Sequence, residues 1–442
     1  MSQKSKDVVL FINSMFAPTI NALRTFEEKT GRHFTPVVIV DINIQESIHT
    51  LNDQNHLIEN HVEVITADFD SPASIRQALK PYEDRLVAVL SQYENSIHEF
   101  KKIIPYLPYL QTPTESSLDW ATDKKLMRAA FDAYDPTLSP ASLHVEDAVP
   151  ATIATIEQKL SYPIIIKPSG LECSLLVSVA NDRTQLADQL RNTFKQLHTA
   201  YRHLLKRLEP SVLVEEFMSG DMYSIDAYVT LDGTCRYTPP VKVVTGNKVG
   251  FDDFFPYLTI TPTGLTAAEI ADANDTVERA CKALGLRATT AHTELIRTPK
   301  GWRIIEIGPR IGGYRPELYG LTIGLNHIAN DIVNRMGIAP EIPVKVLNHA
   351  AVLQTYARQE GKLKTIHGLD KIKQLPSFVS MKQRFQAGDM LYFAQNNGHP
   401  AFEVMLCHAD EAQLQSDLKT VEQVLRIELM AEIPAKVHAS VA

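Results

Sequence analysis

The stretch that decides the fold is TTAHTELIRTPKGWRIIEIGPRIGG at residues 289–313, in which two apolar, β-branched runs flank a short turn. The turn, TPKG, suits a three-residue loop with proline at its first corner and glycine in the left-handed conformation. Such a loop pairs Thr298 with Trp302, and counting outward along the antiparallel strands places Glu294 opposite Glu306. The same count puts three more residues on that face of the sheet: His292, Gly308 and Arg310.

Two glutamates in this arrangement form a candidate metal site. Directly opposed side chains lie about 5 Å apart, and two carboxylates at that distance repel each other unless a cation or a shared proton lies between them. Mg²⁺ accepts one or two protein carboxylates and takes its remaining ligands from water and substrate phosphates. The hairpin alone fits equally an alternative in which one glutamate faces solvent or pairs with Arg303.

Two further strands end in charged residues. The run YPIIIK places Lys167 at a strand end before Pro168, Ser169 and Gly170, where a lysine can hold a phosphate under a mobile loop. The run VLVEEF ends in Glu215 and Glu216, which face opposite sides of the strand, so at most one of them faces a given cleft. Taken alone, a solvated lysine and a polar strand end explain these residues as well.

The hairpin continues into a glycine loop flanked by arginines. Gly312 and Gly313 let backbone amides approach an anionic substrate, and the guanidiniums of Arg310 and Arg315 can grip a carboxylate or stabilise charge in phosphoryl transfer. A structural turn would explain the glycines but not both arginines so near the paired glutamates. We name Arg315 and Lys242 as candidate substrate contacts, and a surface strand explains Lys242 equally well.

The chain before residue 115 alternates short apolar runs, DVVLFI, PVVIVDI, HVEVITADF and RLVAVLS, with polar stretches. Strands that alternate with helices predict a parallel sheet in an α/β domain. No GxGxxG follows the first strand, so a dinucleotide-binding fingerprint is absent. The proline-rich residues 105–117 indicate a linker.

Helical periodicity predicts three helices in the middle of the chain. The first starts near Asp123 and ends before Pro136, the second covers roughly 184–208, and the third runs from Thr266 to a stop at Gly285. Their expected buried stripes are Met127, Ala130, Phe131 and Tyr134; Leu186, Leu190, Phe194, Leu197, Tyr201, Leu204 and Leu208; and Ile270, Ala273, Val277, Ala280 and Leu284. Beyond Pro340, apolar strands and a closing helix at 410–425 predict a small α+β unit.

Composition excludes several classes of protein. The 442 residues contain 44 Lys and Arg against 52 Asp and Glu, with no basic cluster for a nucleic-acid backbone. VVLFI is too short for a signal sequence, and no segment approaches the roughly 18 to 20 apolar residues of a membrane span. The four cysteines lack metal-type spacing and suit a reducing compartment. We expect a soluble, cytoplasmic protein without nucleic-acid or membrane partners.

Taken in order, DKKLMRAAF from 123, YPIIIKPSG from 162, VLVEEFMSG from 212 and the hairpin resemble the successive landmarks of the ATP-grasp superfamily. The resemblance covers roughly 115–340, and the segment after about 345 resembles the C-terminal domain of L-amino acid ligases. It implies an N-terminal parallel α/β domain (1–115), an ATP-grasp domain of two α+β subdomains (116–343, with a mobile lid at about 150–215) and a C-terminal α+β domain (344–442).

The resemblance also implies roles for residues. Lys124 and Lys167 would contact ATP phosphates, and Arg310 would steady an acyl phosphate, with Lys167 and Arg310 acting in catalysis. Glu294 and Glu306 would bind Mg²⁺, or Mn²⁺ in its place. The adenine would lie along four residues of the strand that joins the two subdomains: Glu215, Glu216, Phe217 and Met218.

Two departures from the family pattern stand out. The second metal position usually shows Glu, any residue and Asn, whereas here Glu306 is followed by Ile307 and Gly308, so the third metal side chain is missing. The lid loop is poor in glycine, with Glu172 and Cys173 where small residues are common. The first departure bears on the number of metal ions and the second on lid closure.

The function implied is an ATP-dependent carboxylate–amine ligase that forms an amide or peptide bond between small molecules through an acyl phosphate. The family likeness also allows a homodimer. Two alternatives share the fold: a biotin-carboxylase-like carboxylation of a small molecule, and a nucleotide-binding module without catalysis. The sequence names neither the carboxylate nor the amine.

Overall fold

The computed structural model describes residues 6–44, 57, 59–171, 174–203, 209–396 and 398–430. These residues form two compact units. Those of the first lie within 1–172, 176–243 and 260–347, and those of the second within 173–175, 244–259 and 348–442. The predicted domain boundaries at 115/116 and 343/344 remain predictions.

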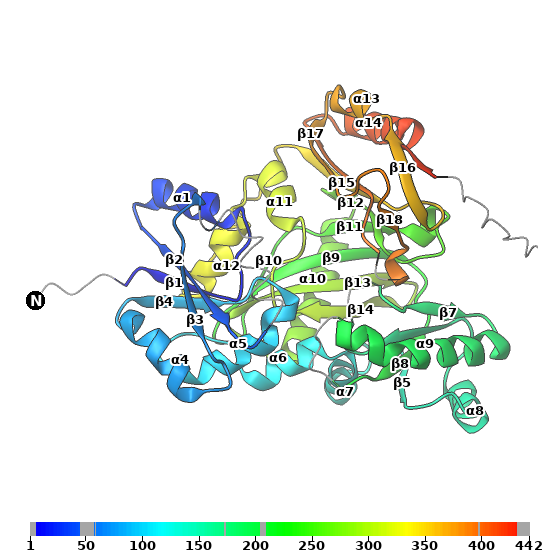
Figure 1. Ribbon diagram of the computed structural model, residues 1–442, viewed down its shortest axis with the longest axis horizontal. Coiled ribbons are helices and arrows are strands. Elements are labelled where there is room, and N and C mark those ends of the chain that lie inside the picture. Colours follow the sequence, from blue (N-terminus) through cyan, green and yellow to red (C-terminus); the bar gives the residue numbers. More distant parts are fainter. Residues whose placement is uncertain are drawn as a thin grey trace, which may run out of the picture. The chain divides into compact units, whose positions relative to one another are not determined.

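The first unit begins with the predicted parallel sheet, which the structure confirms (Figure 1). Its strands run in the order β3-β2-β1-β4 and are all parallel. They are β1 (Val8–Ile12), β2 (Thr35–Asp41), β3 (Glu63–Ala67) and β4 (Leu86–Leu90). The strands alternate with α1 (Thr19–Thr30), α4 (Pro72–Leu79), η1 (Lys80–Tyr82), η2 (Glu94–Ser96), α5 (Ile97–Ile103), η3 (Ile104–Tyr106) and α6 (Glu115–Thr122).

Both faces of this sheet are buried, as its continuous apolar runs require. On one face, Val8, Leu10 and Ile12 pack with α4, α5 and α6. On the other, Val9 and Phe11 pack with α1 and with α12 (His327–Arg335). Helix α12 also contacts β9 and β13, so a single helix ties the parallel sheet to the sheet that carries the hairpin (Figure 1).

A small antiparallel sheet occupies the predicted lid, in the order β5-β8-β6-β7. Its elements are β5 (Ser142–Val145), α8 (Pro150–Lys159), β6 (Ile164–Pro168), β7 (Ser178–Ala180), α9 (Arg183–His203) and β8 (Val212–Glu216). Helix α9 packs on β6 and β7, and four residues of its predicted stripe are buried: Leu186, Leu190, Leu197 and Tyr201. The predicted Leu204 and Leu208 lie outside the described residues.

The hairpin belongs to a larger sheet whose strands in the first unit run β14-β13-β9-β11, with β10 beside β9. The strands are β9 (Asp221–Val229), β10 (Cys235–Tyr237), β11 (Val241–Thr245), β13 (Thr289–Thr298) and β14 (Gly301–Gly308). Three helices complete this part: α7 (Lys124–Tyr134), α10 (Ala267–Ala283) and α11 (Arg315–Ile323). The core between this sheet and α7 and α10 contains Ile225, Val277 and Trp302.

The predicted limits of two helices are confirmed, and one predicted core residue is wrong. Asp123 caps α7, and a capping box at Thr266 starts α10, which stops at Gly285 with φ +61°. Within α7, Met127 and Phe131 are buried, but Tyr134 is 51% exposed because the helix ends there. No helix among the residues described is long and apolar enough to cross a membrane.

The second unit contains both helices and strands. Strands β12-β15-β19-β17 form one sheet segment, and β18-β16-β20 form a separate sheet. Its elements are η4 (Gly246–Val249), β12 (Pro256–Thr261), β15 (His349–Thr355), β16 (Gly361–His367), α13 (Leu369–Lys373), β17 (Phe378–Gln383), β18 (Met390–Leu391), η5 (Ala394–Asn396), β19 (Phe402–His408), α14 (Glu411–Val424) and β20 (Arg426–Leu429).

Candidate active site

The β13–β14 hairpin opposes the two predicted glutamates by a route that differs from the prediction. Its loop has two residues, so Thr298 pairs with Gly301, not with Trp302. A bulge then inserts Ile305, and from there Glu294 pairs with Glu306 as predicted. The predicted turn is therefore wrong by one residue, and the predicted glutamate pair is confirmed.

The bulge has a packing consequence. Trp302 and Ile304 both face the core, so strict alternation would send Glu306 into the core as well. With Ile305 inserted, Glu306 moves to the opposite face and Ile307 enters the core. One extra residue therefore keeps a carboxylate out of the core and places it beside Glu294.

Glu306 lies in a positive environment. Its Oε2 atom is 2.7 Å from Nζ of Lys124, and the same Nζ donates to the carbonyl of Leu171 at 2.8 Å. Burial disfavours ionisation, but Lys124, with Lys167 and Arg310 further off, outweighs it and holds the pKa of Glu306 at about 2. The structure thus brings together a predicted phosphate lysine, a predicted metal ligand and Leu171, which follows β6 in the chain.

Lys167 belongs to a buried cluster that the sequence did not reveal. Its Nζ contacts Oε2 of Glu215 at 2.5 Å, and the other oxygen of Glu215 accepts a hydrogen bond from Nε of Arg128 at 2.7 Å. Arg128 also donates to the carbonyl of Ile305 at 2.6 Å, in the hairpin bulge. This cluster, Arg128–Glu215–Lys167, links α7, the lid sheet and β14.

Burial sets the charge state of the cluster. Desolvation, helped by Arg128 and Lys124 and opposed by Glu215, lowers the pKa of Lys167 to about 8. Desolvation acts against ionisation of Glu215 too, but Arg128 and Lys167 outweigh it and lower the pKa of that carboxyl. The apolar stripe of α7 does not predict a role for Arg128, because such a stripe indicates only which face of a helix is buried. A cation beside Met127 in that stripe was the available signal.

The other predicted nucleotide contacts lie along the end of β8. Glu216 faces away from the cluster, with 49% of its side chain exposed, as expected for the neighbour of a buried Glu215. The amide of Phe217 donates to the carbonyl of Pro163 at 3.2 Å, and Met218 is partly exposed. The strand end is thus anchored to the lid sheet while Glu216 and Met218 keep accessible surface.

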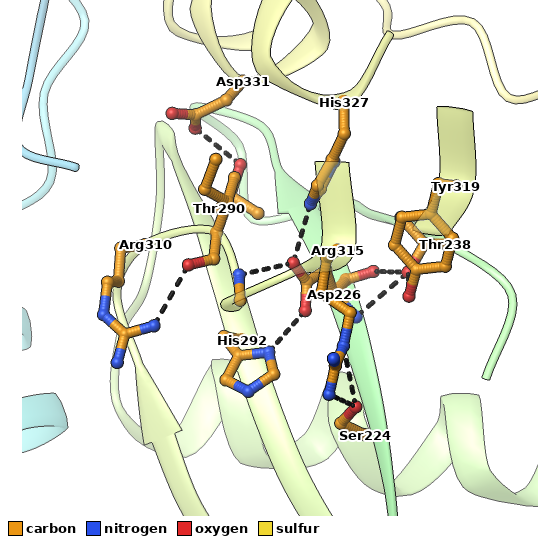
Figure 2. A network of polar contacts seen from close by, with 12 residues as sticks. Ser224, Asp226, Thr238, Thr290, His292, Arg310, Arg315, Tyr319, His327 and Asp331 are labelled. Carbon is orange, nitrogen blue, oxygen red and sulfur yellow. Dashed lines mark hydrogen bonds and ion pairs between the residues drawn. The ribbon is translucent and has the colours of Figure 1, made fainter. Parts of the chain in front are cut away.

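A buried carboxylate, Asp226 on β9, organises the residues behind the glutamates (Figure 2). Its oxygens face Nδ1 of His292 at 2.6 Å and Nε2 of His327 at 2.7 Å, and accept the amide hydrogen of Gly312 at 2.8 Å. Because an ionised carboxylate only accepts hydrogen bonds, both imidazoles donate to it. Despite complete burial, His292 and His327 hold the pKa of Asp226 well below its usual range.

His292 extends this network toward the hairpin carboxylates. Burial works against protonation, but Asp226 outweighs it and raises the pKa of His292. Its Nε2 lies 3.8 Å from Oε1 of Glu294. The sequence placed His292 on the correct face but missed Asp226 and His327. An acidic residue inside the apolar run SIDAYV was the signal for Asp226.

Buried side chains of the protein hold the glycine loop in place. A Cβ at Gly312 would lie 2.4 Å from His292 Nδ1, so only glycine fits between that ring and Arg315. Arg315 is buried, donates to Ser224 Oγ at 2.6 Å and to the carbonyl of Gly313 at 3.0 Å, and so fixes the loop (Figure 2). The predicted loop residues are therefore assembled, with Gly312 and Arg315 engaged by the protein itself.

Two more predicted residues have clear positions. Arg310 lies beyond the hairpin, and its Nε contacts Oε2 of Glu94 at 2.8 Å. Lys242 pairs with Asp221 at 3.0 Å. In the sheet, Lys242 pairs with Tyr223 and Glu294 pairs with Ser224. Because Tyr223 and Ser224 are neighbours on β9, their side chains face opposite sides of the sheet. Lys242 therefore lies on the other face from Glu294 and is not brought together with the other predicted site residues.

The donor set limits what metal the site can hold. No group of three or more His, Cys, Asp or Glu side chains that could hold a metal ion occurs in the part of the chain that the structure describes. Glu294 and Glu306 offer two opposed carboxylates, which fits a hard cation that completes its coordination with phosphates and water. Lys124, Lys167 and Arg310 around them suit a polyanionic ligand.

Comparison with known proteins defines the class. Residues 160–316 match the family model of the ATP-grasp domain. These residues contain the lid sheet from β6 onward, the hairpin and the glycine loop. The predicted resemblance is confirmed for these residues: the chain contains an ATP-grasp domain.

Individual relatives include ligases. An uncharacterised protein, y4rH, of Sinorhizobium fredii is 27% identical over 246 residues, 54% of this chain and 47% of that protein. D-alanine–D-alanine ligase of Streptococcus pneumoniae is 26% identical over 223 residues, 48% of this chain and 56% of the ligase. The chain thus spans about half the length of the curated relatives it matches.

The fold extends beyond the ATP-grasp domain. The structure of an L-amino acid ligase from Bacillus licheniformis superposes with a TM-score of 0.76, covering 97% of this chain and 100% of that one at 16% identity. At that identity the likeness defines the fold, and it confirms the predicted multidomain α/β and α+β architecture.

Proposed function

We propose that this protein is an ATP-dependent carboxylate–amine ligase that forms an amide or peptide bond and releases ADP and phosphate. One observation carries the proposal: an ATP-grasp domain opposes Glu294 and Glu306 on one sheet face, with Lys124 2.7 Å from Glu306 and Arg310 in the following loop. Ligases among the relatives support the same reaction class.

Each candidate site residue has a separate role in the proposed phosphoryl transfer. Lys124 and Lys167 bind ATP phosphates, and residues 215–218 hold the adenine. Glu294 and Glu306 hold Mg²⁺ or Mn²⁺, which when bound neutralises charge on the phosphates. Arg310 stabilises the anionic acyl phosphate, with the glycine loop beside it. The protein contributes positioning and charge, not covalent catalysis.

The proposed chemistry has two steps. A carboxylate oxygen of the first substrate attacks the terminal phosphorus of ATP, forming a carbon–oxygen–phosphorus linkage as the bond to ADP breaks. The nitrogen of an amine then attacks the acyl carbon, phosphate leaves, and the nitrogen loses a proton. We propose amino acids or similar small molecules as substrates, because the fold likeness spans an L-amino acid ligase along its whole length.

The test is ADP and phosphate release by the purified protein with Mg²⁺-ATP across an array of single and paired amino acids, other carboxylates and amines. Release that requires both a carboxylate and an amine supports the ligase and names its substrates. Release that requires bicarbonate instead would point to carboxylation. ATP binding with no ADP formation anywhere in the array would contradict the proposal.

The charge of Lys167 predicts a pH dependence. Only the protonated lysine attracts phosphate, and burial lowers its pKa to about 8. We therefore expect kcat/KM for ATP, which reports the free enzyme, to be level below pH 8 and to fall toward tenfold per pH unit above it. In Lys167→Arg the guanidinium stays protonated, so this inflection should disappear. An inflection unchanged in Lys167→Arg would assign it to another group.

A further inference from the structure

Glu94 reaches the candidate active site from the parallel sheet. It starts η2, four residues beyond the end of β4, at the edge of the sheet where the parallel strands end. Its Oε2 is 2.8 Å from Nε of Arg310, and the two side chains are only 18% and 22% exposed. Nothing in the local sequence around Glu94 relates it to Arg310.

The space that Glu94 occupies exists because residue 308 has no side chain. A Cβ built on Gly308 would lie 3.0 Å from Oε2 of Glu94 and 3.8 Å from Cγ of Arg310. The first distance is tighter than ordinary van der Waals contact, so with a side chain at 308 the carboxylate would have to shift by a few tenths of an ångström. The absence of a side chain at Gly308 therefore leaves a space beside the hairpin. The carboxylate of Glu94, which follows β4 of the parallel sheet, fills that space next to Arg310.

The guanidinium of Arg310 is fixed at two points. Nε forms an ion pair with Glu94, and Nη1 donates a hydrogen bond to the carbonyl of Ile311 at 3.0 Å. Arg310 is also close enough to Glu306 to help lower the pKa of that carboxyl. An ion pair and one hydrogen bond restrict the orientation of the guanidinium, and a donor positioned before the reaction stabilises developing charge without paying to reorganise.

We propose that Glu94 is a positioning residue for Arg310, and that Gly308 is glycine because it leaves room for that contact. This inference rests on the proposed function, in which Arg310 faces the acyl phosphate. Glu94 acts on the rate of the chemical step through Arg310 and makes no contribution to ATP binding. A purely structural tie between the parallel sheet and the hairpin would instead alter stability.

A double-mutant cycle separates these roles. Glu94→Ala and Gly308→Ala should each lower kcat about tenfold and leave KM for ATP within about twofold, because both release Arg310. The double variant should be no slower than either single variant. Glu94→Asp should recover part of the rate in the wild-type background. Losses that multiply in the double variant, or a rise in KM for ATP with unchanged kcat, would overturn the proposal.

A matched control and a second measurement complete the design. Asp7→Asn breaks a carboxylate–arginine pair of similar length, 2.7 Å to Arg85, beside the start of β1 at the opposite edge of the same sheet, and should leave kcat unchanged. Wild-type protein without ligase turnover would refute the proposed function alone.

The Nε–H NMR signal of Arg310, assigned with Arg310→Lys, tests the contact independently. Its chemical shift should change in Glu94→Ala and in Gly308→Ala, and the same shift in all three proteins would refute the positioning role.

Discussion

Replacing Glu306 by glutamine is expected to lower substrate-dependent ADP release by about 100-fold or more. Changing only a group behind a metal ligand typically costs 10- to 100-fold, so removing the charge of a ligand should cost at least as much. Glutamine keeps the size of the side chain. Calorimetry with Mn²⁺ and a non-hydrolysable ATP analogue should show weaker metal binding in parallel with the loss of rate.

The matched control is Glu278→Gln, which breaks another glutamate–lysine pair, 2.6 Å to Lys282 on α10. It should leave both ADP release and Mn²⁺ affinity unchanged. Because Glu306 also pairs with Lys124, a slow variant with normal Mn²⁺ affinity would assign Glu306 to holding Lys124 and remove it from the metal site.

Replacing Glu215 by alanine is expected to lower the free energy of unfolding by about 3–5 kcal/mol, the usual cost of leaving a buried charge without its partner. The carboxylate is 1% exposed and neutralises two cations, Arg128 and Lys167. Its loss leaves both of them buried among α7, the lid sheet and β14. Urea unfolding followed by circular dichroism measures the change, because these helices and strands contribute much of the secondary structure of the first unit.

Glu216→Ala provides the control for this prediction, because it removes the same side chain one position along the strand. Glu216 is 49% exposed and its carboxylate lies 3.8 Å from the amine of Lys300, so the free energy of unfolding should change by no more than about 0.5 kcal/mol. Equal effects of the two substitutions would show that Glu215 does not stabilise the fold by neutralising the buried cations of this cluster. Glu215→Leu, if as stable as the wild type, would lead to the same conclusion.

Local patterns predicted most of the secondary structure. Apolar runs of strand length predicted β1 to β4, and helical periodicity predicted helix starts near Asp123 and at Thr266. The opposed glutamates were predicted because a hairpin is a local structure whose register follows from its turn. The turn itself was wrong by one residue, since a bulge at Ile305 depends on which side chains the core of α7 and α10 accepts.

The local sequence patterns did not predict the long-range ion pairs. Glu215 meets Arg128 across 87 residues, and Asp226 meets His327 across 101. A periodic pattern reports which face of an element is apolar, but it carries no information on which charged residue another element will bring to that face. Arg128, Asp226 and Glu94 therefore looked like ordinary polar residues.

The sequence by itself determined the order of strands and helices, the ATP-grasp landmarks and the face shared by Glu294 and Glu306, because these depend on neighbours within a hairpin or a helix turn. Only the tertiary structure decided that Glu215 and Arg315 are engaged inside the protein, that Lys242 lies on the other face, and that Glu94 fills the space beside Gly308. Such choices arise when separate sheets pack together, since a buried charge must find its partner there or be excluded.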